Sequence, residues 1–88
     1  MKLTAEVKVK NRLGLHIRPA TAIVKMLQGS RATVHFTFKG QTVNAKSIMS
    51  LLVLSAQKNA KISILVEGDD AQIVLEKLLH GFDTLFGE

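Results

Sequence analysis

The sequence predicts a single α+β domain in which a four-stranded, mainly antiparallel sheet is covered on one face by three helices. Apolar residues recur at every second position in several segments, which is typical of half-buried strands, and at helical spacing in three others. Because each strand has one apolar face and each helix one apolar stripe, we expect the elements to pack in two layers. A chain of 88 residues buries one modest core, so we expect residues 1–88 to form one domain.

Four segments are predicted to be strands. Residues 3–10 alternate between apolar and polar side chains without error, and residues 31–38 alternate again. The dipeptide at 39–40, Lys-Gly, indicates a tight turn into a short strand at 41–43, which predicts a hairpin. Residues 61–67 carry three apolar side chains on one face and form the last strand.

Three segments are predicted to be helices, which gives the element order β-α-β-β-α-β-α. The first helix ends at Gly29, which suits the left-handed position after a helix. The second is expected to run over about residues 47–57 and to be closed by Asn59 in the left-handed conformation. Residues 68–70 offer a turn and an acidic N-cap for the third, whose apolar stripe covers residues 71–82.

Composition and charge narrow the classes of function. The absence of cysteine excludes disulfides, thiolate chemistry and cysteine-based zinc sites. No apolar segment suits a secretory signal or a membrane span, so we expect a cytoplasmic protein without membrane insertion. The net charge is +5, and residues 1–61 hold eleven of the twelve Lys and Arg but one of the seven acidic residues. This basic region would attract an acidic or anionic partner.

The segment around Pro19 is where we expect chemistry. Proline is tolerated only in the first turn of a helix, so the first helix begins near residues 16–18 and His16 lies at its N-terminal edge. Free backbone N–H groups and the helix dipole make this edge positive, and Arg18 adds a cation. Gly14, just upstream, allows a sharp turn or a close approach of the backbone.

This environment has a consequence for the His16 ring. A positive environment favours the neutral imidazole, which leaves one ring nitrogen free as a nucleophile. The same N–H groups and Arg18 would hold an anion attached to the ring. We therefore hypothesise that His16 is reversibly phosphorylated. An alternative fits the residues alone equally well: His16 caps the helix and Arg18 is a solvated charge.

Two segments, residues 13–20 (LGLHIRPA) and residues 43–49 (VNAKSIM), resemble the motifs of the HPr family, the phosphocarriers of the bacterial phosphoenolpyruvate:sugar phosphotransferase system. Residues 13–20, LGLHIRPA, are similar to the phosphohistidine motif of that family. Residues 43–49, VNAKSIM, are similar to its second motif, which surrounds a regulatory serine. The spacing of the two motifs, the chain length and the order of the elements agree as well, so the resemblance covers the whole chain.

The resemblance implies an open-faced β-sandwich with strand order 1-4-2-3 and three helices on one side. It implies that His16 accepts a phosphoryl group on Nδ1 from enzyme I, charged by phosphoenolpyruvate, and passes it to a histidine of an enzyme IIA domain. Arg18 would stabilise the phosphoryl group. The chain would then be a monomeric carrier and not an enzyme. Departures from the family pattern at Ile17, Ser50 and Asn59 bear on the choice of partners and leave the carrier chemistry intact.

Ser47 matches the regulatory phosphorylation site of the family, which a dedicated HPr kinase/phosphorylase modifies in many bacteria. Taken by itself, a serine here is more simply the N-cap of the second helix. The two roles are compatible. A phosphate at Ser47 would add negative charge and weaken docking to an acidic partner.

The second helix is expected to contribute a docking surface. Its apolar residues cannot all face the core, because one stripe covers only part of a helix. Those that remain exposed among basic side chains would bind partner proteins. The predicted partner-binding residues are Ile17, Thr21, Lys25, Lys46, Ile48, Met49 and Leu52. The alternative is a thicker core, which is favoured most for Leu51 and Leu54.

Other functions compete with this interpretation. A nucleic-acid-binding module would use the basic region, but there is no Trp or Tyr for stacking, and Phe36 and Phe38 are expected to face the core. A small hydrolase of the acylphosphatase type has a similar size and element order and would not need His16. A nitrogen-branch or purely regulatory paralogue would keep the same motifs.

The three histidines lie on different elements, so we expect no metal site, and we expect no cofactor.

Overall fold

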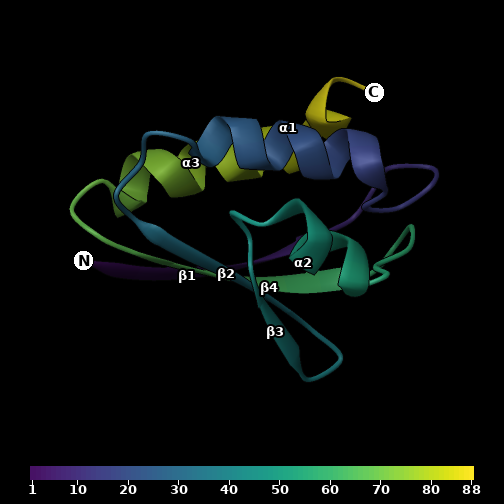
Figure 1. Ribbon diagram of the computed structural model, residues 1–88, viewed down its shortest axis with the longest axis horizontal. Helices are drawn as coiled ribbons and strands as arrows, with labels where there is room; N and C mark the ends of the chain where they lie inside the picture. The colour runs from purple at the N-terminus through teal and green to yellow at the C-terminus, as the bar shows by residue number, and fades with distance from the viewer.

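The structure, a computed structural model, describes residues 1–88 as two layers, a sheet and a layer of helices (Figure 1). The elements in chain order are β1 (Lys2–Lys8), α1 (Ile17–Leu27), β2 (Thr33–Phe38), β3 (Gln41–Asn44), α2 (Ile48–Val53), β4 (Lys61–Glu67), α3 (Ala71–Asp83) and the short 3₁₀ helix η1 (Leu85–Gly87). Helices α1 and α3 lie next to each other over the sheet, and the shorter α2 lies beside α1. None of the helices has the length and apolar character needed to cross a bilayer. The predicted α+β class, with three helices on one face of the sheet, is confirmed.

The four strands form one sheet in the order β1-β4-β2-β3, and every neighbouring pair is antiparallel. Strand β4 therefore lies between β1 and β2, where Ile64 faces Ala5 on one side and Phe36 on the other. The predicted hairpin joins β2 to β3. Lys39 and Gly40 both have positive φ, 50° and 78°, as a two-residue turn between twisted strands requires.

A single hydrophobic core fills the space between the sheet and the helices. Its 19 buried apolar residues form one cluster, to which the sheet contributes Phe36 and Ile64, α1 contributes Ile23, and α3 contributes Leu78 and Phe82. The complete burial of one Leu, Ile or Phe side chain contributes about 1.5–3 kcal/mol. The apolar strand faces and helix stripes seen in the sequence therefore account for the packing that fixes α1 on the sheet.

Helix α2 is shorter than the sequence predicts, because it ends at Val53 and not near Gln57. Ser55 adopts a left-handed φ of 52°, which turns the chain, and Ala56 then accepts a hydrogen bond from the N–H of Leu15 at 2.9 Å. Asn59 has the predicted left-handed φ, 76°, but it lies in the loop before β4 and does not cap α2. A contact between distant segments, and not a local signal, ends this helix.

Smaller differences occur at other element ends. Strand β1 stops at Lys8, and Val9 continues the pairing outside the ladder through bonds with Asn59 and Ala60. Asp70 occupies the N-cap position of α3, yet its carboxylate does not cap the helix and accepts a hydrogen bond from Ser30 Oγ at 2.8 Å. No local pattern in the sequence predicts η1, which turns the last residues back toward α1.

Candidate functional site

His16 lies at the N-terminal edge of α1, as the position of Pro19 predicts. It is the N-cap residue, with extended backbone angles (φ −78°, ψ −169°), and its carbonyl accepts the first helical hydrogen bond from Ala20 N at 3.1 Å. No side chain caps this helix end, so the N–H groups of Ile17 and Arg18 have no partner within the helix. Pro19 is the third helical residue and is buried, where its missing N–H costs nothing. The helix therefore presents free donors beside His16.

The loop before His16 is held firmly against the segment after α2. Gly14 has a φ of +72°, and its N–H donates to Asn11 O at 3.0 Å. A Cβ on Gly14 would overlap the carbonyl oxygen of Ala56 and the Cα of Gln57. Both predicted roles of this glycine, a sharp turn and a close approach, are confirmed, and together with the Leu15–Ala56 bond they fix where His16 stands.

The His16 ring has an acidic partner that the sequence did not reveal. Its Nε2 lies 2.7 Å from Oε2 of Glu88, and both side chains are largely covered, with 26% and 20% of their surfaces exposed. The other oxygen of this carboxylate, Oε1, accepts a hydrogen bond from Asn11 Nδ2 at 2.5 Å. The predicted positive environment of His16 is therefore incomplete, because a carboxylate contacts the ring at its Nε2 atom.

The electrostatics of Glu88 follow from these contacts. The hydrogen bond from Asn11 has the largest effect and lowers the pKa of the Glu88 carboxyl below its ordinary value of 4.5. Partial burial acts in the opposite direction, and the hydrogen bond with His16 and the charges of His16 and Arg18 lower the pKa further. Glu88 is thus a stable carboxylate at neutral pH. A carboxylate next to the ring stabilises positive charge on it, in opposition to the helix dipole and Arg18.

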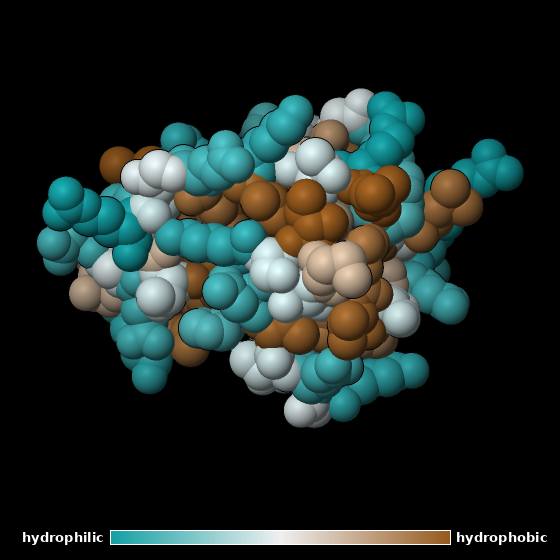
Figure 2. Space-filling view, viewed as in Figure 1, coloured by the Kyte–Doolittle hydropathy of each residue, from teal (hydrophilic) through white to brown (hydrophobic).

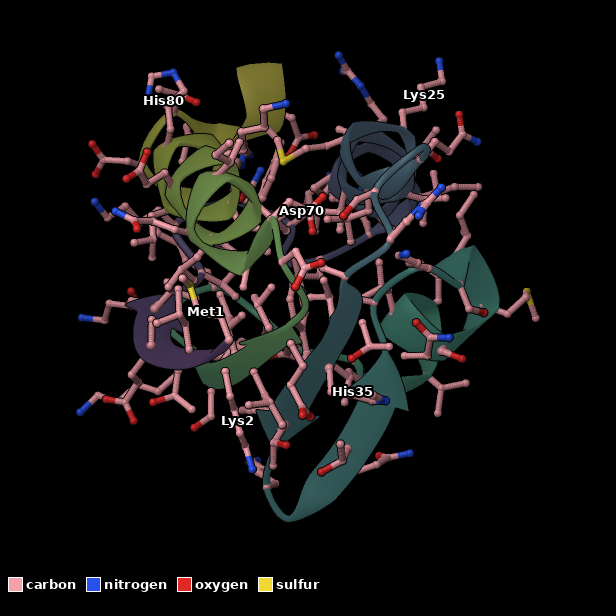
Figure 3. All side chains as sticks on the ribbon, turned by 90° about the vertical axis from the view of Figure 1, so that its left-hand side faces the viewer. Met1, Lys2, Lys25, His35, Asp70 and His80 are labelled. Atoms are coloured by element: carbon pink, nitrogen blue, oxygen red, sulfur yellow. The ribbon has the colours of Figure 1, made fainter.

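A shallow hollow lies beside this pair at the start of α1. It is lined by Ile17, Arg18, Thr21, Ala22, Lys25, Phe86 and Glu88. The side chains of Arg18 and Lys25 form no ion pair and no hydrogen bond, so both cations are available to an anion or an acidic partner. Thr21 turns its hydroxyl back to the carbonyl of Ile17 at 2.7 Å. Figure 3 shows Lys25 pointing away from α1. His35 lies on β2 and His80 on α3, and neither lines this hollow.

Ser47 is the N-cap of α2, as the capping alternative predicts. Its Oγ accepts a hydrogen bond from Ser50 N at 3.2 Å, and the residue is partly buried. Lys46, predicted to surround the docking surface, instead donates its ammonium to the carbonyl of Ser30 at 2.7 Å. Its side chain therefore ties α2 to the end of α1 and is less free than Lys25 for a partner.

Helix α2 leaves part of its apolar side uncovered. Met49 and Val53 are 71% and 57% exposed, whereas Leu51 and Leu54 are buried in the core. Among the other predicted docking residues, Ile48 and Leu52 are partly buried, and Ile17 on α1 is exposed. Figure 2 shows hydrophobic surface extending over α1 and α2 on this face. The sequence prediction included Met49 but not Val53, since helical spacing alone did not show which side of so short a helix is covered.

Comparison with known proteins identifies the family. The sequence model described as the phosphorylation site of the HPr component of the phosphotransferase system (PTS) matches residues 3–83. The chain belongs to the HPr family. It is 42% identical over 87 residues to the phosphocarrier protein HPr of Chlamydia pneumoniae, an alignment that covers 99% of this chain and 81% of that protein.

Solved HPr structures agree with the fold. An HPr structure from Thermoanaerobacter tengcongensis superposes with a TM-score of 0.93 at 29% identity, covering 98% of this chain and 97% of that one. The HPr of Bacillus anthracis gives a TM-score of 0.83 at 36% identity, covering 88% and 92% of the two chains. The predicted open-faced sandwich with strand order 1-4-2-3 is therefore the HPr fold, and this chain is a PTS phosphocarrier by family.

Proposed function

We propose that this chain accepts a phosphoryl group on His16 from enzyme I, charged by phosphoenolpyruvate, and passes it to a histidine of an enzyme IIA domain. The observation that carries the proposal is the position of His16. His16 is the N-cap residue of an uncapped helix start, and it is followed by Ile17 and Arg18, whose N–H groups have no helical partner, and the Arg18 guanidinium is unpaired. His16 and Arg18 lie in the part of the chain that matches the family, residues 3–83.

The transfer step follows from these groups. The lone pair on Nδ1 attacks phosphorus, an N–P bond forms, and the bond between phosphorus and the donor group of enzyme I breaks and leaves its electron pair with the donor. Charge spreads over the phosphoryl oxygens in this step, so positioning and electrostatic stabilisation dominate catalysis. The free N–H groups and Arg18 supply that stabilisation. The same step in reverse, with the IIA histidine as acceptor, regenerates His16, so the chain acts as a carrier.

A docking surface for these partners is proposed beside His16. It consists of Ile17, Thr21, Lys25, Ile48, Met49 and Leu52, with Lys46 at its edge. Exposed apolar side chains supply contact area, and Met49 adapts to partners of different shape. Because Lys25 and Arg18 are unpaired, the complementary partner surface is acidic. The chain would act in the cytoplasm as a monomeric single domain.

Regulatory phosphorylation of Ser47 by an HPr kinase/phosphorylase is proposed as well. The hydroxyl already accepts the N–H of Ser50, so a phosphate there would sit at the helix start with its oxygens near a backbone donor. It would add about −1.5 to −2 charge next to Met49 on the docking surface. An acidic partner would then be repelled, while the cap itself would remain.

Labelling with enzyme I and radioactive phosphoenolpyruvate tests the carrier function. The wild-type chain should take up one phosphoryl group in an adduct that is labile to acid and stable to base. His16→Ala should take up none, while His35→Ala and His80→Ala, which alter histidines on β2 and α3, should be labelled like the wild type. Labelling of His16→Ala would refute the proposal.

A further inference from the structure

The contact between His16 and Glu88 restricts where the ring carries its proton. A carboxylate at neutral pH has only acceptor oxygens, so the 2.7 Å contact with Oε2 needs a hydrogen on Nε2 of His16. In the neutral ring the other nitrogen, Nδ1, then has the free lone pair. Nδ1 is the atom that the proposed phosphoryl transfer uses.

The Glu88 carboxylate is held next to the His16 ring by a hydrogen bond from Asn11. Asn11, which is fully buried, uses its one amide nitrogen to donate both to Glu88 Oε1 at 2.5 Å and to the carbonyl of Leu85 at 2.9 Å. Leu85 and Phe86 have left-handed φ values of 60° and 49°, which reverse the chain after α3. The turn and the carboxylate are thus held by the same side chain.

The turn is also fixed by aromatic packing. The Phe86 ring meets Phe82 edge to face at a centroid distance of 4.9 Å. The missing side chain of Gly81 makes room for it, since a Cβ there would overlap the Phe86 ring. Two independent contacts, the hydrogen bonds of Asn11 and the packing of Phe86 on Phe82, therefore position Glu88 next to His16.

We propose that Glu88 is a positioning residue for phosphoryl transfer: its carboxylate holds His16 in the Nε2–H tautomer, and it balances the positive charge that the ring acquires when the Nδ1–P bond forms. This inference rests on the proposed function of His16. The proton stays on Nε2 throughout, so Glu88 accepts a hydrogen bond and takes up no proton. Carboxylates that orient metal-binding histidines contribute about 10- to 100-fold to affinity or activity, and we expect an effect of the same order on phosphoryl transfer here.

The variant Glu88→Gln tests this role sharply because of Asn11. In the variant, the buried Asn11 amide is still bonded to the carbonyl of Leu85, so it continues to donate to the side-chain oxygen of residue 88. The single carbonyl oxygen of a glutamine would be taken by Asn11, and its NH₂ group would then face Nε2. That arrangement favours the opposite tautomer of His16, with the hydrogen on Nδ1. The Nδ1 lone pair would no longer be available.

Two measurements on the full chain test the positioning role of Glu88. Nitrogen-15 spectra of the His16 ring, recorded at about pH 9 where an ordinary histidine is neutral, should show the Nε2–H tautomer in the wild type and a shift to Nδ1–H in Glu88→Gln. The initial rate of labelling by enzyme I should fall about 10- to 100-fold in the variant. Glu6→Gln, which removes an exposed carboxylate on β1, should change neither.

The outcomes separate this inference from the carrier function. If the wild type is labelled and Glu88→Gln has the same tautomer or the same rate, Glu88 has no positioning role and the carrier function stands. If the wild type takes no phosphoryl group from enzyme I, both proposals fail.

Discussion

The N–H of Leu15 donates to the carbonyl of Ala56 at 2.9 Å, and this bond joins the loop that carries His16 to the segment that follows α2. The same contact accounts for two features of the molecule. It ends α2 at Val53, before the predicted end near Gln57. It also places Gly14 so close to the backbone of Ala56 and Gln57 that a side chain at position 14 does not fit. The position of His16 therefore depends on a junction between two distant parts of the chain.

Substitution of Gly14 should show the strength of this junction. Gly14→Ala adds both a left-handed strain and an overlap with backbone atoms, so we expect a loss of about 2–5 kcal/mol in the free energy of unfolding. Gly29→Ala is a matched control, because Gly29 also has a left-handed φ, +83°, but has no atom within 4 Å of a new Cβ. It should cost about 1–2 kcal/mol. Equal losses for the two variants in urea unfolding would show that the junction is loose.

The pKa of Glu88 should be depressed in solution. The hydrogen bond from Asn11 is the largest cause, so the carboxyl should titrate below 4.5 by NMR, and Asn11→Ala should raise its pKa more than His16→Ala does. Because the pKa is lower in the folded state than in the unfolded state, the carboxylate stabilises the fold above about pH 4.5. This contribution is lost as the pH falls through the folded-state pKa. A wild-type midpoint at or above 4.5 would contradict these contacts.

Ser47 should show two separable roles. Ser47→Ala removes the acceptor of the Ser50 N–H and should lower the free energy of unfolding by about 1 kcal/mol. Ser47→Asp keeps a capping oxygen and should leave stability nearly unchanged, while its charge weakens binding to enzyme I. Thermal unfolding and titration calorimetry measure the two effects. Full affinity of Ser47→Asp for enzyme I would argue against regulation through charge at this position.

The docking surface can be tested with a charge at its exposed centre. Met49→Glu places a carboxylate on the surface that we propose binds an acidic partner, so affinity for enzyme I should fall about 10-fold or more. Ile73→Glu changes another exposed apolar residue, on α3 and outside this surface, and should bind like the wild type. Both variants should fold, since both positions are open to solvent. The same affinity for both variants would place the docking surface elsewhere.

The sequence predicts the parts of the molecule that local rules control. Pro19 allows a helix to begin only within the preceding residues, so backbone sterics alone predicted that His16 lies at the start of α1. The alternation in residues 61–67 and the Lys39-Gly40 turn likewise gave β4 and the hairpin. Each of these signals lies within a few residues of the structure that it specifies.

Features set by contacts between distant residues could not be predicted. The end of α2 depends on Leu15, and Lys46 is held by Ser30. Glu88 lies 72 positions from His16, and no local pattern near Glu88 points to a histidine. Nothing in the sequence around Asn11, a polar residue in a loop, predicts that its side chain is buried next to Glu88. The sequence thus predicted the place of His16 but not the carboxylate beside it.

The identity of the phosphorylated atom is the most direct test of the account. The protein labelled with nitrogen-15 in its histidines is phosphorylated with enzyme I and phosphoenolpyruvate, and coupling between phosphorus and the ring nitrogens is recorded. We predict coupling to Nδ1 of His16, with Nε2 of the same ring still carrying its proton. Coupling to Nε2, or to His35 or His80, would contradict the account.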